Sequence, residues 1–208
     1  GYPELEGIAA ADVDQARKLL AEAGYPDGAG LPPVRFKIPD GQESLRVAGI
    51  MAKAWEAAGL KTAIDPFDYD EYLLEVKKPD YTLGTVTWIG DYPDPLTFLQ
   101  MWVTGSNLND ARYAGPDFDE LIDQSLGQED EQRYQTLGKA ESLLLDQAVV
   151  LPISHAPAFT LIDLDQVEGW FPNVLNIHPF KYLRFQTERV PPGVALGAAR
   201  GVARRPAR

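Results

Sequence analysis

The sequence predicts an α/β fold around a parallel sheet, and two observations lead to this prediction. First, segments with strand composition alternate with segments of helical periodicity over the first 90 residues, in the repeated order helix then strand. This order is typical of βαβ units, whose strands run parallel. Second, a chain of 208 residues that is 45% hydrophobic can bury one good core beside a second, partial unit.

Caps and periodicity place the first elements. Asp12 opens a capping box for a first helix, and Gly24 ends that helix. Alternating residues over 34–38 predict a strand. Ser44 can cap a second helix, which ends at Gly59.

The alternation continues beyond this helix. Residues 60–64 predict a second strand and residues 68–78 a short helix. Residues 81–88 are rich in β-branched and aromatic side chains and predict a third strand. Two more helices follow, one with Pro116 at its first position and a longer one over residues 130–147.

From residue 149 the character of the chain changes. Residues 149–154 and 159–162 are apolar, β-rich and separated by a proline turn, which predicts a hairpin. Residues 180–185 predict a last strand. The tail beyond Val190 is rich in Ala, Gly, Pro and Arg without periodicity, so we expect it to be disordered.

Charge and composition exclude several function classes. The formal net charge of −12 argues against nucleic acid and anionic membrane surfaces as partners. The absence of cysteine excludes disulfides, thiolate metal sites and a cysteine nucleophile. No apolar run approaches the roughly 20 residues that span a bilayer. His155 and His178 lack metal-ligand spacing, so we expect packing roles for them and neither metal nor cofactor.

The most informative stretch is residues 88–99, with the sequence WIGDYPDPLTFL. Gly90 and two prolines end the predicted strand there, and aromatic and carboxylate side chains gather at its carboxyl end. Ligands of open α/β sheets bind outside the carboxyl ends of strands. A carboxylate beside an aromatic wall suits a cationic ligand such as an α-amino group.

This stretch resembles the motif W-x-(G/A)-D-x-x-(D/E)-P-x-(T/S)-F-L of the family 5 extracellular solute-binding proteins, the peptide receptors of ABC importers. Residues 12–28 resemble the family's helix and turn A-x-x-L-L-x-E-A-G-Y-x-D-G. Residues 140–153 and 169–182 resemble the segment before a terminal strand and the family's closing run. The order and spacing fit from about residue 8 to about residue 186, but the family's proteins are much longer. The chain therefore resembles their C-terminal part.

The resemblance implies a periplasmic-binding-protein-type lobe (type II-like) with a return segment. Residues 1–148 would form the C-terminal α/β ligand-binding lobe. Residues 149–186 would be return strands that complete the N-terminal lobe, with a hinge near residues 147–150, and residues 187–208 have no counterpart in the family. The implied partners are a short peptide, the membrane-embedded ABC permease subunits and the missing N-terminal lobe. The implied location is the periplasm or, as a lipoprotein, the cell surface.

The family motif also implies roles for individual residues. Asp91 would form a salt bridge with the N-terminal amine of a peptide, and Tyr92 stands beside it. Trp88 would form a pocket wall, and the edge from Trp88 through Ile89 to Gly90 would pair with the peptide as an added strand. The alternatives are a helix-capping or turn role for Asp91 and a core position for Trp88.

Other polar residues are weaker candidates. Asn107 and Asn109 lie in a polar loop that either bonds a ligand or turns the chain. Lys77 and Lys78 could reach a ligand carboxylate, but lysines at helix ends are also favoured by the helix dipole. Asp94, between two prolines, is the better candidate for a cap.

Two other function classes stay open. Pairs such as Asp91 with Asp94, or Asp117 with Asp119, could serve as the acid and base of a carboxylate-dependent hydrolase. The sequence has no G-x-S-x-G, Walker, H-E-x-x-H or G-x-G-x-x-G motif, so we do not expect an enzyme. The other class is a fragment that cannot bind ligand by itself, or an interaction module.

Overall fold

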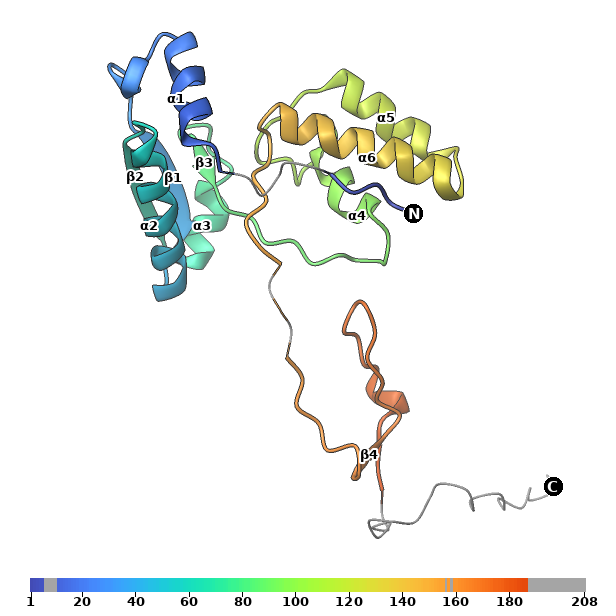
Figure 1. Cartoon of the computed structure of the whole chain (residues 1–208). Coiled ribbons are helices and arrows are strands. Elements are labelled where there is room, and N and C mark those ends of the chain that lie inside the picture. Colours follow the sequence, from blue (N-terminus) through green and yellow to red (C-terminus); the bar gives the residue numbers. More distant parts are fainter. Residues whose placement is uncertain (6–10, 156, 158, 187–208) are drawn as a thin grey trace, which may run out of the picture. The chain divides into compact units, whose positions relative to one another are not determined.

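A computed structural model describes residues 1–5, 11–155, 157 and 159–186 (Figure 1). The chain divides into two compact units, Gly1–Pro152 and Ile153–Arg208. The assignment of residues 149–186 to another lobe stays a prediction. The expected disordered tail, residues 187–208, lies outside the described residues.

The first unit contains a three-stranded parallel sheet with the strand order β2–β1–β3, which confirms the βαβ prediction. The central strand β1 (Val34–Pro39) pairs along its whole length with β2 (Thr62–Phe67), whereas β3 (Leu83–Gly84) pairs over two residues. Pro66 fits within β2 because that strand lies at the edge of the sheet.

Helices follow in the predicted order, and two of them pack on the sheet. The helices of the first unit are α1 (Val13–Glu22), α2 (Gln42–Ala57), α3 (Tyr69–Glu75), α4 (Leu96–Leu99), α5 (Pro116–Leu126) and α6 (Asp130–Asp146), with 3₁₀ turns η1 (Pro26–Gly28) and η2 (Gln100–Trp102). Phe36 and Ile38 point to one face of β1, where Phe36 meets Trp55 of α2 edge to face with ring centroids 5.6 Å apart. Lys37, between them, points to the other face, towards α3.

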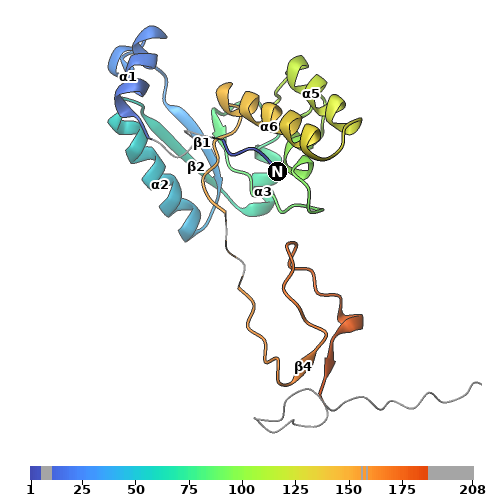
Figure 2. The same ribbon diagram turned by 45° about the vertical axis from the view of Figure 1, so that its right-hand side comes forward.

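A second core lies among α4, α5 and α6. Figure 2 shows α5 and α6 side by side, and Phe118 of α5 and Leu137 and Ala140 of α6 are fully buried in one cluster. Leu99 of α4 and Trp102 belong to the same cluster. Phe118, Leu137 and Ala140 come from the two predicted helices, and Pro116 takes the first position of α5 as expected.

The predicted caps are confirmed at one helix and wrong at another. The carboxylate of Asp12 accepts the Gln15 N–H at 2.8 Å and caps α1. The second helix begins at Gln42, not at Ser44, because the carbonyl of Gly41 already accepts the Leu45 N–H at 2.9 Å. Gly41 has a φ of 149°, which glycine adopts readily.

Two glycines join distant turns by direct backbone contact. A Cβ on Gly28 would lie 1.9 Å from the carbonyl oxygen of Gly59, and both residues have positive φ, 74° and 101°. The turn after α1 and the turn between α2 and β2 therefore touch without side chains between them.

The predicted strand over residues 81–88 is too long, because β3 ends at Gly84. At the next residue, Thr85, the hydroxyl of Tyr72 on α3 replaces a neighbouring strand as the hydrogen-bond partner. It accepts the Thr85 N–H at 2.8 Å and donates to the Thr85 carbonyl. A side chain thus satisfies backbone groups that a neighbouring strand would otherwise bind.

Among its described residues, the second unit contains one small antiparallel pair, β4 (Val167–Glu168) with β5 (Arg184–Phe185), and a 3₁₀ turn, η3 (Phe180–Tyr182). The predicted hairpin is wrong, since no described residue of 149–154 or 159–162 lies in a strand. The predicted last strand is reduced to β5. Throughout the described residues, no helix is long and apolar enough to cross a membrane.

Candidate functional site

The predicted binding stretch leaves β3 and enters the second core. Trp88 is half-buried against that core, whereas Ile89 is 79% exposed. A Cβ on Gly90 would lie 3.1 Å from Cγ2 of Thr97, so the absence of a side chain lets the segment pass close to α4. The structure thus gives Trp88 a packing contact and leaves Ile89 open to solvent.

Asp91 presents an exposed carboxylate on an anchored backbone. Its N–H donates to Oγ1 of Thr97 at 3.0 Å, and Thr97 is fully buried. Within the part of the chain that the structure describes, the Asp91 carboxylate has neither an ion pair nor a hydrogen bond. An exposed acid on a fixed backbone can receive a cationic group without first losing an internal partner.

In contrast to Asp91, Asp94 has hydrogen-bond partners for both of its carboxylate oxygens. Its two carboxylate oxygens accept from Nη1 and Nη2 of Arg133 at 2.7 and 2.8 Å. One of them also accepts the Leu96 N–H at 2.9 Å, so Asp94 caps α4 as predicted. The Arg133 guanidinium is the main reason that the pKa of Asp94 lies below its usual value.

Tyr92 lies between these two acids in sequence and packs partly buried against the second core. Burial, followed by the negative charges of Asp94 and Asp91, raises the pKa of its hydroxyl. The Tyr92 hydroxyl is therefore available as a hydrogen-bond donor at neutral pH.

The two asparagines of the polar loop lie in different environments. The side chain of Asn109 is buried and holds the loop together: its Nδ2 donates to the carbonyls of Trp102, Val103 and Tyr113, and its Oδ1 accepts the Tyr113 N–H at 3.0 Å. Asn107 is exposed, and its main-chain carbonyl accepts from Nζ of Lys77. The amide of Asn109 is thus used within the fold, whereas that of Asn107 faces solvent.

The two lysines before β3 are bound within the chain. Lys77 forms an ion pair with Asp110, and Lys78 forms one with Glu75. These pairs agree with the structural alternative given above for both lysines.

Sequence reasoning missed a buried lysine in the centre of the sheet. The Lys37 side chain is 1% exposed, and its Nζ binds Glu75 Oε2 at 3.0 Å and Asp80 Oδ1 at 2.6 Å. Burial alone would lower the pKa of Lys37, but the hydrogen bonds to Asp80 and Glu75 outweigh it and raise the pKa. The partners are 38 and 43 residues away, so no local pattern points to this cluster.

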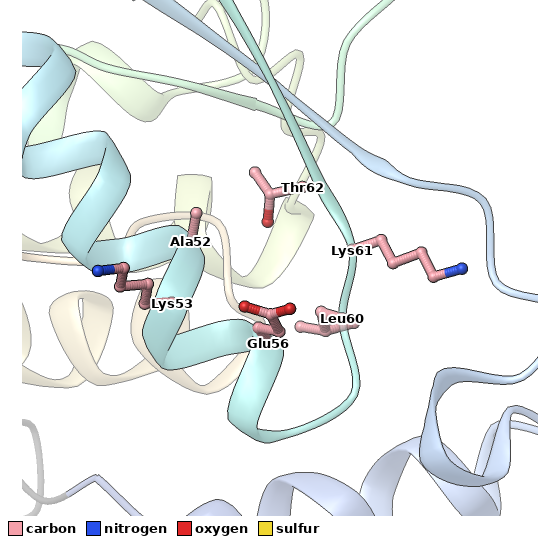
Figure 3. A pocket seen from close by; sticks show the side chains of 6 residues that line it. All are labelled: Ala52, Lys53, Glu56, Leu60, Lys61 and Thr62. Carbon is pink, nitrogen blue, oxygen red and sulfur yellow. The ribbon is translucent and has the colours of Figure 1, made fainter.

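A separate cavity of about 270 Å³ lies between α2 and the start of β2 (Figure 3). The carboxylate of Glu56 and the hydroxyl of Thr62 face its interior, whereas the amino groups of Lys53 and Lys61 point away from it. None of the predicted binding residues lines this cavity. Across the described residues, no cluster of three or more His, Asp or Glu could hold a metal ion.

Comparison with known proteins identifies the class. Residues 1–110 match the family described as bacterial extracellular solute-binding proteins, family 5 Middle. The structure is similar to a periplasmic oligopeptide-binding protein of Borrelia burgdorferi, with a TM-score of 0.71 and 25% identity over 89% of this chain and 38% of that one. The chain belongs to the family 5 solute-binding proteins and has their periplasmic-binding-protein-type α/β fold.

Curated relatives carry names of several ligand classes. Heme-binding protein A of Haemophilus influenzae is 30% identical over 84% of this chain and 32% of its own length. Oligopeptide-binding protein OppA of Bacillus subtilis is 29% identical over 65% of this chain and 26% of its own. Probable di/tripeptide-binding protein 5 of Pseudomonas aeruginosa is 32% identical over 81% and 32%, respectively. The chain thus spans between a quarter and a third of the length of these relatives.

Proposed function

We propose that this chain is the C-terminal ligand-binding part of a peptide receptor that serves an ABC importer. The observation that carries the proposal is the exposed carboxylate of Asp91, which has no partner among the described residues and stands on a backbone fixed by Thr97. Such an arrangement suits the ammonium group at the N-terminus of a peptide. The ligand is bound and released unchanged, with no catalytic step.

The backbone between β3 and Asp91 offers the second element of the site. Residues 85–90 lie outside any strand. Their remaining backbone groups can pair with an extended peptide as an added strand, which gives affinity without selecting side chains. Trp88 would border the site, and Asn107 is the remaining polar candidate.

The missing part of the receptor would supply the other wall. Large apolar side chains of the second unit are exposed, among them Phe159 at 91% and Phe180 at 88%. This exposure favours their being covered by an N-terminal lobe of the same protein. Closure of two lobes around a peptide would exclude water, and the closed form would dock on the permease. Such a receptor works in the periplasm or as a lipoprotein at the cell surface.

The test is calorimetric titration of the receptor with trialanine and with N-acetyl-trialanine. We expect Asp91→Ala to weaken trialanine binding about tenfold or more, because it removes a desolvated ion pair. Asp123→Ala, which removes an exposed acid from α5, is the matched control and should change nothing. Equal affinity of the wild type for both peptides would refute the ammonium site.

Haem is the comparison ligand, because one similar protein is named for it. A free amine plays no part in recognising a porphyrin. Haem binding that survives Asp91→Ala, together with no binding of trialanine, would replace the peptide proposal by a haem proposal.

A further inference from the structure

We propose that Arg133 is a positioning residue for ligand binding, which acts through Asp94 to hold the Asp91 carboxylate in place and free of competition. This inference rests on the proposed function of Asp91. It assigns a role to a residue on α6 that lies 42 positions further along the chain and is not part of the binding stretch.

The ion pair has the geometry of a rigid clamp. Two parallel hydrogen bonds of 2.7 and 2.8 Å join the guanidinium of Arg133 to the carboxylate of Asp94. The two side chains are only 19% and 25% exposed, so solvent screens the pair weakly. A planar two-point contact fixes orientation as well as distance, which a lysine could not do.

The clamp is connected to the Asp91 backbone by short steps. The Asp94 N–H donates to the Tyr92 carbonyl at 2.8 Å, and the Asp94 carbonyl accepts the Thr97 N–H at 3.2 Å. Thr97 in turn receives the Asp91 N–H on its hydroxyl. Fixing Asp94 therefore fixes both neighbours that define the position of Asp91.

The ion pair also gives different roles to two acids three residues apart, Asp91 and Asp94. With Arg133 present, the charge of Asp94 is neutralised and its oxygens are occupied, so Asp91 is the acid left to receive a cation. Without Arg133, Asp94 would be a second unpaired carboxylate close to the site. It could attract the ammonium group to a position where the peptide backbone does not meet residues 85–90.

The test compares Arg133→Gln with the wild-type receptor, using trialanine and N-acetyl-trialanine in calorimetry. We expect the affinity for trialanine to fall about tenfold, with the weak affinity for the acetylated peptide unchanged, because only the ammonium contact is misplaced. Arg133→Lys should recover part of the loss. Arg46→Gln, which breaks the exposed Arg46–Glu43 pair on α2, is the matched control and should bind like the wild type. Equal weakening of both peptides, or no change, would overturn the proposal.

A second readout needs no ligand and separates this inference from the proposed function. Hydrogen exchange of the Asp91 and Leu96 amides should be about tenfold faster in Arg133→Gln, while the amides of Phe36 and Ile38 in β1 keep their rates. Unchanged exchange at Asp91 and Leu96 would refute the positioning role even if the wild type binds no peptide. Faster exchange at all four amides would mean a general loss of stability and would refute it as well.

Discussion

The two units of this chain differ in how far their apolar side chains are buried. Phe118 in the first unit is 0% exposed and Phe159 in the second is 91% exposed. The first unit builds two buried clusters, one on β1 and one among α4, α5 and α6. In the second unit, none of the described residues is buried.

The contrast teaches that hydrophobic composition does not by itself specify a core. The first unit contains a sheet and helices that pack together, so apolar residues such as Phe36 and Phe118 meet partners in two closed clusters. The second unit has a pair of two-residue strands and, among its described residues, no α-helix to cover them. Exposed apolar side chains of this kind are what we expect if the N-terminal lobe proposed above covers them.

The largest effect is expected from removing a buried phenylalanine ring from the first unit. We expect Phe118→Ala to lower the free energy of unfolding by about 3–5 kcal/mol, because it leaves a cavity in a closed core. Urea unfolding followed by circular dichroism measures this loss. A loss below ~1 kcal/mol would mean that the second core is not closed.

The buried lysine tests the sheet half of the first unit. Lys37→Met removes a cation that two carboxylates share, and we expect a loss of about 2 kcal/mol because their hydrogen bonds go unreplaced. The matched control is Lys53→Met on the surface of α2, which should cost little. If both variants unfold at the same urea concentration, the Lys37 cluster contributes nothing to stability.

The pH dependence of stability tests the ion pair between Asp94 and Arg133 beside the second core. Because Arg133 lowers the folded-state pKa of Asp94 below the ordinary value of about 3.9, the pair contributes its full stability above that value. The contribution is lost as the pH falls through the lowered folded-state pKa.

The melting temperature of Asp94→Asn should therefore lie below that of the wild type by a constant margin at pH 5–7, and the margin should shrink towards pH 2. Asp123→Asn should show no margin at any pH. A margin that grows on acidification would contradict the assigned pairing.

The smallest effect belongs to the second unit. Phe159→Ser should change the free energy of unfolding by less than about 0.5 kcal/mol, because the ring is already in water. A large loss of stability would show that Phe159 packs against the rest of the chain.

The elements with strong local signals could be predicted from the sequence. The helix started by Asp12 and the parallel pairing of β1 and β2 follow from caps and periodicity. The end of β3 could not be predicted, because it depends on Tyr72, 13 residues away from Thr85. The same holds for the site: the motif pointed to Asp91 and Asp94, but the partner of Asp94 is 39 residues away on α6.

The hairpin failed for a different physical reason. Residues 149–162 have the composition of strands, but strands form only where another backbone is at hand to pair with them. The composition of a segment shows its preference for the strand conformation, but it does not show whether a second strand is present to pair with it.

The touching glycines, Gly28 and Gly59, have a consequence for how this chain can change over evolutionary time. Since each Cα faces the backbone of the other turn, a methyl group at either position has no space. Ordinarily a larger residue is accommodated when its neighbour becomes smaller. Here the atoms in the way belong to the backbone of Gly59 on one side and of Asp27 and Gly28 on the other, so no second-site substitution can compensate. In a saturation mutagenesis experiment, both positions should reject every replacement, in single and in paired variants alike.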